Sequence, residues 1–157
     1  MHAMRSRIAA ASAISIAAAL LLPLAGGTAD AATTPAGHVS PATAYFDAID
    51  RGSTLEPGDY IYVYPTGGGG DLVRLIMQTD GNLVLYSDSF VCFATGTYGH
   101  PGAYATYENS GSLIVFNEVG QPLWSSDTPG TKGTTLSLNE NDGSLYVGDN
   151  FIAGPCY

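Results

Sequence analysis

Basic residues are scarce in this sequence. Lysine and arginine together number 5 in a chain of 157 residues, against 14 aspartates and glutamates, and the formal net charge is −9. Proteins that bind nucleic acid or anionic membrane surfaces need lysine and arginine to contact the phosphates. The composition therefore disfavours nucleic acid and membranes as partners, and the need for solubility is enough to explain the acidic charge.

Long apolar segments are also scarce, and the single one lies at the N-terminus. Arg5 and Arg7 precede the alanine-rich segment 8–24, and small residues follow up to Ala31. This order is typical of a secretory signal peptide. A membrane anchor is the alternative, but the segment is short for a bilayer span and no second one follows. We predict a signal peptide over 1–31 and a secreted, extracellular protein without membrane insertion.

Only two cysteines are present, Cys92 and Cys156. In an exported chain the simplest use of two cysteines is one disulfide. Two free thiols or a bridge between chains are the alternatives. A metal site is disfavoured, because two cysteines without a neighbouring histidine cannot supply the four ligands of a structural zinc site. We expect neither a metal nor another cofactor.

Residues that would mark an enzyme are scarce as well. Beyond the signal peptide the histidines are His38 and His100, and neither lies near a serine or cysteine in a nucleophile motif. The acidic residues could form the carboxylate pair of a glycosidase, but nothing in the sequence distinguishes any pair. We therefore predict no enzymatic activity and no catalytic residues.

Helical patterns are missing, and β-strand patterns take their place. No segment has apolar residues at helical spacing between capping residues. From about Ser53 onward, short runs of strand-forming residues alternate with Gly, Asn and Asp, as in 60–64, where tyrosines alternate with Ile and Val. Residues 32–52 contain prolines and glycines and little periodicity. We predict a linker or N-terminal arm over 32–52 and an all-β domain over 53–157.

The all-β segment contains three repeats of about 31 residues. They read "QTDGNLVLY" (78–86), "ENSGSLIVF" (108–116) and "ENDGSLYVG" (140–148). The glycines of these segments lie 30 and 32 residues apart. A second landmark, an aromatic residue, follows each segment at Phe93, Trp124 and Tyr157. The repetition predicts one supersecondary unit used three times.

The glycine predicts a hairpin in each repeat. In the first, residues 79–81 are expected to form a three-residue loop that ends with Gly81 at positive φ. The residues that flank the loop then face each other, and the following strand alternates between the core and an exposed face. The exposed face collects the five polar and apolar side chains of Gln78, Asp80, Asn82, Val84 and Tyr86.

These five side chains suit a sugar. A carboxylate accepts hydrogen bonds, whereas the amides and the phenol both donate and accept, so together they can match neighbouring hydroxyls. The valine can cover apolar C–H groups. A shallow site of this kind should bind a monosaccharide at about millimolar concentration. The alternative is a solvated hairpin face without a ligand, since strands commonly alternate polar and apolar residues.

The pattern at 78–86 resembles the complete Gln-x-Asp-x-Asn-x-Val-x-Tyr motif of the bulb-type lectins, the snowdrop-like mannose-binding lectins of monocots. The segment "LWSSDT" (123–128) is similar to a recurring aromatic segment of that family, and the three repeats over 53–157 resemble its whole domain. The sequence is identified as a secreted, bacterial-type member. The resemblance implies a β-prism II fold, with three four-stranded antiparallel sheets about a pseudo-threefold axis and the three repeat aromatics at its centre.

The resemblance also assigns roles to the five residues. It implies that Gln78, Asp80, Asn82 and Tyr86 hydrogen-bond the hydroxyls of mannose, and that Val84 packs on the ring carbons. It implies no metal. The expected partners are mannose-type glycans or polysaccharide.

The second and third repeats depart from the motif. At the five positions the second has Glu108, Ser110, Ser112, Ile114 and Phe116, and the third has Glu140, Asp142, Ser144, Tyr146 and Gly148. The second loses both amides and the phenol, and the third keeps only the aspartate. We therefore expect one working site, in the first repeat. One weak site gives little avidity unless chains associate, for example as a homodimer.

The cysteines depart from the family as well, because its usual disulfide lies within the first repeat. Here Cys92 precedes Phe93 and Cys156 precedes Tyr157, so they hold equivalent positions in the first and third repeats on this alignment. Together with export, this symmetry favours a disulfide between them.

Two other functions stay open. One is a lectin-like bacteriocin or other antimicrobial protein, which the single domain disfavours because such proteins usually have two. The other is a protein-interaction β-prism that has lost sugar binding. The intact first motif disfavours it, and the two altered motifs favour it.

Overall fold

The computed structural model describes residues 42–67, 69–130 and 132–157, which belong to the unit Pro41–Tyr157. The predicted signal peptide, 1–31, lies outside the described residues, as does the predicted arm up to residue 41. All helix-or-strand structure in the described part is β-strand. Within this part, no helix is long and apolar enough to cross a membrane.

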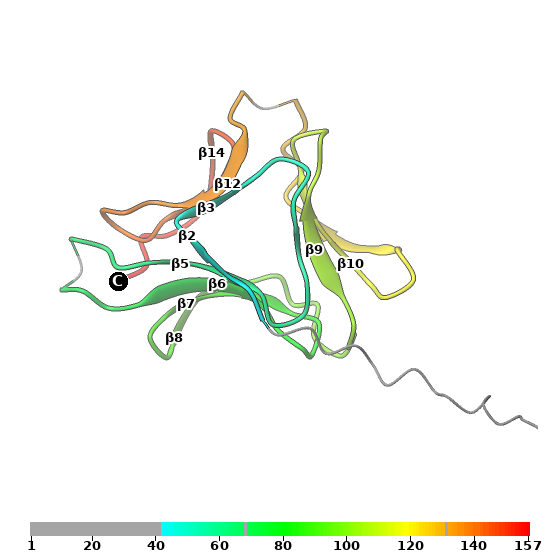
Figure 1. Ribbon diagram of the computed structural model, residues 1–157, viewed down its shortest axis with the longest axis horizontal. Coiled ribbons are helices and arrows are strands. Elements are labelled where there is room, and N and C mark those ends of the chain that lie inside the picture. Colours follow the sequence, from blue (N-terminus) through cyan, green and yellow to red (C-terminus); the bar gives the residue numbers. More distant parts are fainter. Residues whose placement is uncertain (1–41, 68, 131) are drawn as a thin grey trace, which may run out of the picture. The chain divides into compact units, whose positions relative to one another are not determined.

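Three sheets surround a common hydrophobic core (Figure 1). The first sheet has the order β2-β5-β6-β7-β8, with β2 Ala44–Phe46, β5 Tyr60–Val63, β6 Val73–Met77, β7 Leu83–Ser87 and β8 Phe90–Ala94. The second has the order β11-β10-β9-β4, with β4 Thr54–Leu55, β9 Tyr104–Tyr107, β10 Leu113–Phe116 and β11 Pro122–Ser125. The third has the order β14-β13-β12-β3, with β3 Ala48–Asp50, β12 Thr135–Leu138, β13 Leu145–Val147 and β14 Asn150–Ala153. The predicted all-β architecture of three sheets is confirmed.

The first sheet differs from the predicted set of four antiparallel strands. Strand β2 adds a fifth strand and runs parallel to β5, with Phe46 opposite Tyr62. The other strand pairs of the described residues are antiparallel. The first sheet therefore has a wider exposed face than the other two.

Part of the predicted arm, 32–52, belongs to the sheets. Strand β2 pairs with β5 in the first sheet, and β3 pairs with β12 in the third, where Ile49 lies opposite Leu136. Ile49 is only 5% exposed. The boundary at residue 53 is therefore wrong, because strands of three residues are too short to show the alternation on which the prediction depends.

Alternation of buried and exposed side chains builds the core. On β6, Val73, Leu75 and Met77 are fully buried, whereas Arg74 and Ile76 are partly exposed on the other face. The inward residues of all three sheets join one cluster. Fully burying a side chain of this kind contributes roughly 1.5–3 kcal/mol, so this face determines the register of each strand. Binding residues are left to the outer faces.

A β-bulge interrupts the outermost strand pair of each sheet. The register shifts leave one residue without an opposite partner on β8, β11 and β14, namely Cys92, Leu123 and Ile152. The residues that follow the bulges are Phe93, Trp124 and Ala153. The rings of Phe93 and Trp124 meet edge to face, with centroids 5.8 Å apart. The third repeat therefore contributes an alanine where the first two contribute aromatic rings.

The prediction that Tyr157 lies at the centre is wrong. Its side chain is 57% exposed, and the counterpart of Phe93 and Trp124 in the third repeat is Ala153. The sequence aligns Tyr157 with Phe93 and Trp124 because it is an aromatic residue near the end of the third repeat. The bulge, which sets the true register, has no distinct signal in the sequence.

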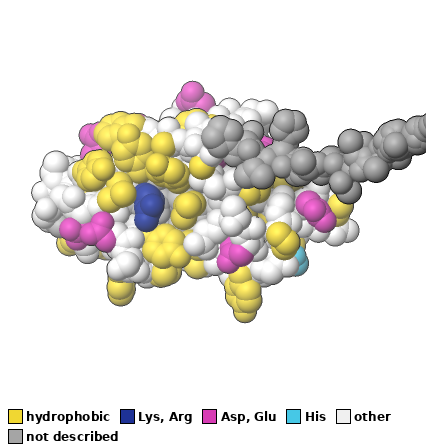
Figure 2. Space-filling model, turned by 60° about the horizontal axis from the view of Figure 1, so that its bottom comes forward, with side chains coloured by type: hydrophobic (Ala, Val, Ile, Leu, Met, Phe, Trp, Pro, Cys, Tyr) yellow, Lys and Arg dark blue, Asp and Glu magenta, His cyan; other side chains and the backbone are white. Residues whose placement is uncertain are grey.

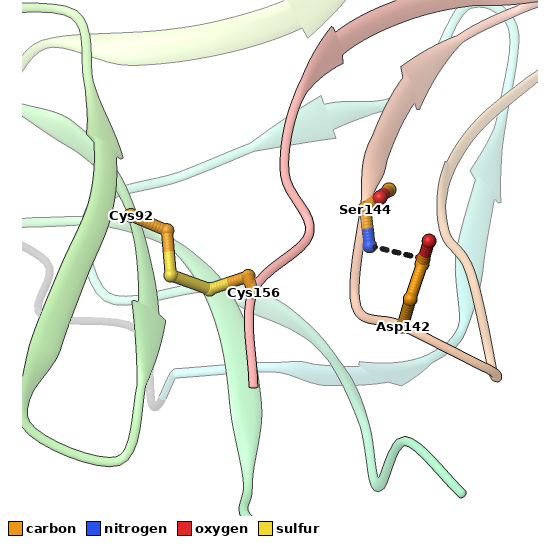
Figure 3. The surroundings of a disulfide bond; sticks show 4 residues. All are labelled: Cys92, Asp142, Ser144 and Cys156. Atoms are coloured by element: carbon orange, nitrogen blue, oxygen red, sulfur yellow. Dashed lines mark hydrogen bonds between the residues drawn. A yellow bond between two sulfur atoms is a disulfide. The ribbon is translucent and has the colours of Figure 1, made fainter. Parts of the chain in front are cut away.

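The predicted disulfide between Cys92 and Cys156 is present (Figure 3). Their Cα atoms are 5.8 Å apart. Cys156 lies beyond the end of β14, is 1% exposed, and donates its N–H to the carbonyl of Asp142 at 2.8 Å. The two cysteines do not hold equivalent positions, since the counterpart of Cys92 is Ile152. The bond thus links the C-terminal tail to the first sheet.

Arg51, which follows β3, connects segments of the second and third repeats. Its Nη2 donates to the Gly133 carbonyl and, at 3.3 Å, to Tyr107 Oη. The guanidinium carbon also lies 5.4 Å from the centroid of the Tyr107 ring. Hydrogen bonds that involve a charged group contribute roughly 1.5–3 kcal/mol. The segment that was predicted as an arm is therefore bonded to the rest of the domain.

Candidate functional site

The predicted hairpin of the first repeat joins β6 to β7. The N–H of Gln78 donates to the Asn82 carbonyl at 2.9 Å, and the N–H of Gly81 donates to the Gln78 carbonyl at 3.0 Å. Gly81 has a φ of 96°. Asp80 Oδ1 accepts the N–H of Asn82 at 3.0 Å, which fixes the carboxylate at the tip of the turn. The three-residue loop with its glycine is confirmed.

A neighbouring loop packs directly against this turn. The N–H groups of Gly99 and His100 donate to the Asp80 carbonyl at 2.9 and 3.0 Å. A Cβ atom added at Gly81 would lie 2.3 Å from the His100 carbonyl oxygen. Only glycine fits at position 81, because both the positive φ and the close approach exclude a side chain.

Asn82 has a structural role that the sequence analysis missed. Its Oδ1 accepts hydrogen bonds from Thr95 Oγ1 at 3.1 Å, Gly96 N at 2.9 Å and Thr97 N at 3.1 Å. The amide oxygen of Asn82 therefore holds the segment that follows β8. Its Nδ2 has no hydrogen bond with a described residue and remains able to donate.

A signal for this role was present in the repeats. Thr97 Oγ1 donates to the Gly81 carbonyl at 2.7 Å, and Thr128 Oγ1 donates to the Gly111 carbonyl at 3.0 Å. The last threonines of "TGT" (95–97) and "SDT" (126–128) thus make the same hydrogen bond, to the carbonyl of the turn glycine, in two repeats. Their recurrence indicates a segment that packs against the hairpin turn.

Gln78 and Tyr86 complete the site on the outer face of the first sheet. Gln78 Nε2 donates to Tyr86 Oη at 3.0 Å, so the phenol proton remains free to donate elsewhere. Val84 lies between them on β7 but is only 2% exposed, and it offers less apolar surface than expected. The structure brings all five predicted residues to one hairpin.

The second repeat has the same hairpin without the same chemistry. The N–H of Glu108 donates to the Ser112 carbonyl and that of Gly111 to the Glu108 carbonyl, each at 2.9 Å. Ser112 is 6% exposed and has no amide group to donate outward. The backbone is repeated, but the donors of the first site are not.

The third repeat corrects the sequence alignment. Its hairpin is closed by the N–H of Asn139, which donates to the Ser144 carbonyl at 2.9 Å. The residue that corresponds to Gln78 is therefore Asn139 and not Glu140, because the loop is one residue longer. Asp142 Oδ1 accepts the N–H of Ser144 at 3.0 Å (Figure 3), the same bond that Asp80 makes in the first repeat.

The site consists of neutral amides, one carboxylate and one phenol. Among the described residues, no group of three or more His, Cys, Asp or Glu side chains could hold a metal ion. The chemistry available at the hairpin is hydrogen bonding by oriented donors and acceptors, which suits a polyhydroxylated ligand.

Comparisons with known proteins found several relatives, although no family model matches the chain. A mannose-specific lectin of Aloe arborescens is 35% identical over 76 residues, which cover 47% of this chain and 70% of the relative. The crystal structure of a lectin from Allium sativum is similar with a TM-score of 0.55 and 30% identity, covering 68% of this chain and 98% of that one. The mannose-specific agglutinin of snowdrop (Galanthus nivalis), solved in complex with methyl-α-D-mannoside, gives a TM-score of 0.54 and 29% identity, with 68% and 94% covered.

Proposed function

We propose that this chain, which belongs to the family of mannose-specific monocot bulb lectins, binds mannose-type glycans through the hairpin of its first repeat. The relatives are carbohydrate-binding proteins and not enzymes, in agreement with the sequence-based prediction. The β-prism II fold of three sheets is shared with them.

The hydrogen bonds within the hairpin carry this proposal, because they orient the binding groups before a ligand arrives. Asn82 Oδ1 is held by three donors, so Nδ2 is aimed and unpaired. Asp80 uses Oδ1 for the turn, which leaves Oδ2 as an acceptor. Gln78 donates to Tyr86 and leaves the phenol proton as a donor. Groups that are already ordered lose little conformational entropy when they bind.

This arrangement favours one stereochemistry. A carboxylate oxygen and an amide N–H that flank the same turn can pair with two neighbouring hydroxyls, one as donor and one as acceptor. A sugar whose hydroxyl points away leaves one of these groups unpaired, which costs about 1–3 kcal/mol. We therefore propose selectivity for mannose over galactose, with a dissociation constant of about 1 mM for the monosaccharide.

Replacing Asp80 by asparagine should weaken this binding strongly. Asparagine keeps Oδ1 for the turn but replaces the free acceptor oxygen by a donor, so the affinity for methyl α-mannoside should fall at least tenfold, the size of a lost charged hydrogen bond. The measurement is a titration followed by the side-chain amide signals of Gln78 and Asn82 in NMR spectra, with methyl α-galactoside as the control ligand.

The third repeat supplies a matched control variant. Asp142 makes the same turn bond to Ser144, so Asp142→Asn tests the loss of a turn carboxylate outside the proposed site. We expect this variant to bind like the unmodified protein. Equal weakening in both variants would contradict a site confined to the first repeat, and unchanged binding in Asp80→Asn would contradict the site itself.

We also propose that the protein is secreted after removal of residues 1–31. The support is the order of a basic start, an apolar segment and small residues before the cleavage point. The mass of the protein recovered from the culture medium should correspond to a chain that begins at Ala32. Retention of the whole chain in the cells would contradict secretion.

A further inference from the structure

A row of side chains crosses the outer face of the first sheet beside the mannose site. Its members lie opposite one another on neighbouring strands. Phe46 pairs with Tyr62, Tyr62 pairs with Arg74, and Arg74 pairs with Tyr86. Residues that are directly opposite on neighbouring strands share a face of the sheet. Tyr86 therefore belongs both to the mannose site and to this row, so the two are continuous.

Aromatic rings form most of the row. The Tyr62 ring lies 5.5 Å from the Phe46 ring, 6.0 Å from the Tyr60 ring and 6.2 Å from the Tyr64 ring, measured between centroids. Phe46 is 54% exposed and Tyr64 is 56% exposed. Figure 2 shows hydrophobic side chains gathered around a basic side chain on one face of the molecule. Aromatic side chains thus gather on this outer face, and contiguous exposed apolar surface of this kind can serve as a binding site.

Arg74 gives the row a positive charge that no acidic residue neutralises. Within the described residues it has neither an ion pair nor a hydrogen bond, and its Nε is buried without a partner. The chain as a whole is strongly acidic, with a formal net charge of −9. A guanidinium whose residue lies opposite two tyrosines, Tyr62 and Tyr86, and whose donors are unused, is suited to an anion supplied from outside.

We propose that this row is a second subsite, which takes a carboxylated sugar linked to the mannose in the first site. The inference rests on the proposed function, because the two sugars are parts of one glycan. Arg74 lies diagonally across from Val84, a separation of about 7–8 Å between strand positions, which a directly linked sugar ring can reach. The preferred ligand is therefore an acidic oligosaccharide and not a neutral mannan.

Each side chain has a role in this subsite. The Arg74 guanidinium donates two parallel N–H···O bonds to the carboxylate. The rings of Tyr62 and Phe46 cover the C–H face of the sugar, and the Tyr62 hydroxyl is available to its hydroxyls. A ligand without the carboxylate still stacks on the rings but leaves the Arg74 guanidinium without a partner. Selectivity should therefore depend on Arg74 and should weaken with salt.

The test compares two disaccharides that differ only in the carboxylate, glucuronosyl-mannose and glucosyl-mannose of the same linkage. Both are titrated by calorimetry into the secreted chain, in 50 mM and in 500 mM NaCl. We expect the acidic disaccharide to bind about tenfold more tightly at low salt, the size of a charge-assisted hydrogen-bonded pair, and the preference to shrink at high salt. Arg74→Gln should bind the two disaccharides equally.

Lys132→Gln is the matched control, because it removes the same charge from an exposed loop outside the first sheet. It should keep the preference for the acidic disaccharide. Arg74→Lys keeps the charge but loses the fork of parallel donors, so its preference should fall below that of the unmodified chain. If Arg74→Gln does not fold, Arg74→Lys still tests the subsite.

Methyl α-mannoside, titrated in parallel, separates this inference from the proposed function. If the mannoside binds and the two disaccharides bind equally, the acidic subsite is overturned while the mannose site stands. If the mannoside does not bind but an Arg74-dependent preference is found, the mannose assignment fails, whereas recognition of a carboxylated sugar by Arg74 stands. If sedimentation finds a dimer that Arg74→Gln dissociates, the row is an interface between copies and the subsite is overturned.

Discussion

Replacing Cys92 and Cys156 together by alanine should lower the free energy of unfolding by about 4 kcal/mol, the cost expected in the chain-entropy model for a loop of this length. The bond joins residues separated by 64 positions, so it restricts a large part of the unfolded chain. Both side chains also pack against the core, and Cys156 is 1% exposed. For a domain of this size, the melting temperature should fall by roughly 15 °C.

Urea unfolding followed by the fluorescence of Trp124 measures this change. The described chain has no free cysteine, so reduction of the unmodified protein should reproduce most of the loss of stability of the double alanine variant, apart from the packing of the two sulfur atoms. The midpoint should shift in both cases, whereas agreement of oxidised and reduced protein within 1 kcal/mol would contradict a stabilising bond. Mannose binding of the folded variant should persist, because neither cysteine belongs to the hairpin.

Replacing Gly81 by alanine should lower the free energy of unfolding by about 3 kcal/mol or more and remove mannose binding. Two costs add. A non-glycine residue at positive φ costs roughly 1–2 kcal/mol, and the new Cβ would lie 2.3 Å from the His100 carbonyl oxygen, so the loop must move. Since Asp80 and Asn82 flank this glycine, any movement of the turn misplaces two of the proposed sugar contacts.

Gly99→Ala separates the two costs. Gly99 has a similar φ of 89°, but no atom beyond its two chain neighbours lies within 4 Å of a Cβ added there. It should lose only about 1 kcal/mol, from backbone conformation. Equal losses of stability in the two variants would show that the close approach at Gly81 contributes nothing. Gly81→Ala is also titrated with methyl α-mannoside without urea, where the variant is folded. Absence of binding there shows that the site is lost although the fold is kept.

The sequence predicted the hairpin of the first repeat well, for a physical reason. Alternation on a strand has a period of two, and a glycine in the turn fixes where that alternation begins. The position of Gly81 therefore assigned Gln78 and Asn82 to opposite strands and Leu83 to the core. Within this hairpin, the register of β6 against β7 follows in the same way from local residues.

The parts that were not predicted depend on contacts between distant segments. Strands β2 and β3 are three residues long, and only their partners β5 and β12 show that they are strands. The longer loop of the third repeat hid the role of Asn139, because Glu140 fits the motif equally well by sequence. The three hydrogen bonds to Asn82 Oδ1 come from residues 95–97, and one repeat alone does not connect these residues to the turn; only their recurrence in the second repeat does.

In the candidate site, too, the sequence motif and the structure differ. Val84 matches the motif, yet its 2% exposure limits what it can offer to a ligand. Arg74 matches no motif, yet register places it beside Tyr86. A motif names residue types, whereas burial and register determine which of them a ligand can reach.

The short strands near residue 50 have a kinetic consequence. Within residues 44–55 the chain passes through all three sheets, as β2, β3 and β4, and the partners of β3 and β4 lie much later in the sequence, in β12 and β9. Ile49, for example, cannot pair until Leu136 has been synthesised. Contacts between such distant residues slow folding, because a long loop must close before they form. During synthesis β3 and β4 remain unpaired edges until most of the chain has emerged, and they are exposed to edge-to-edge association for the same interval.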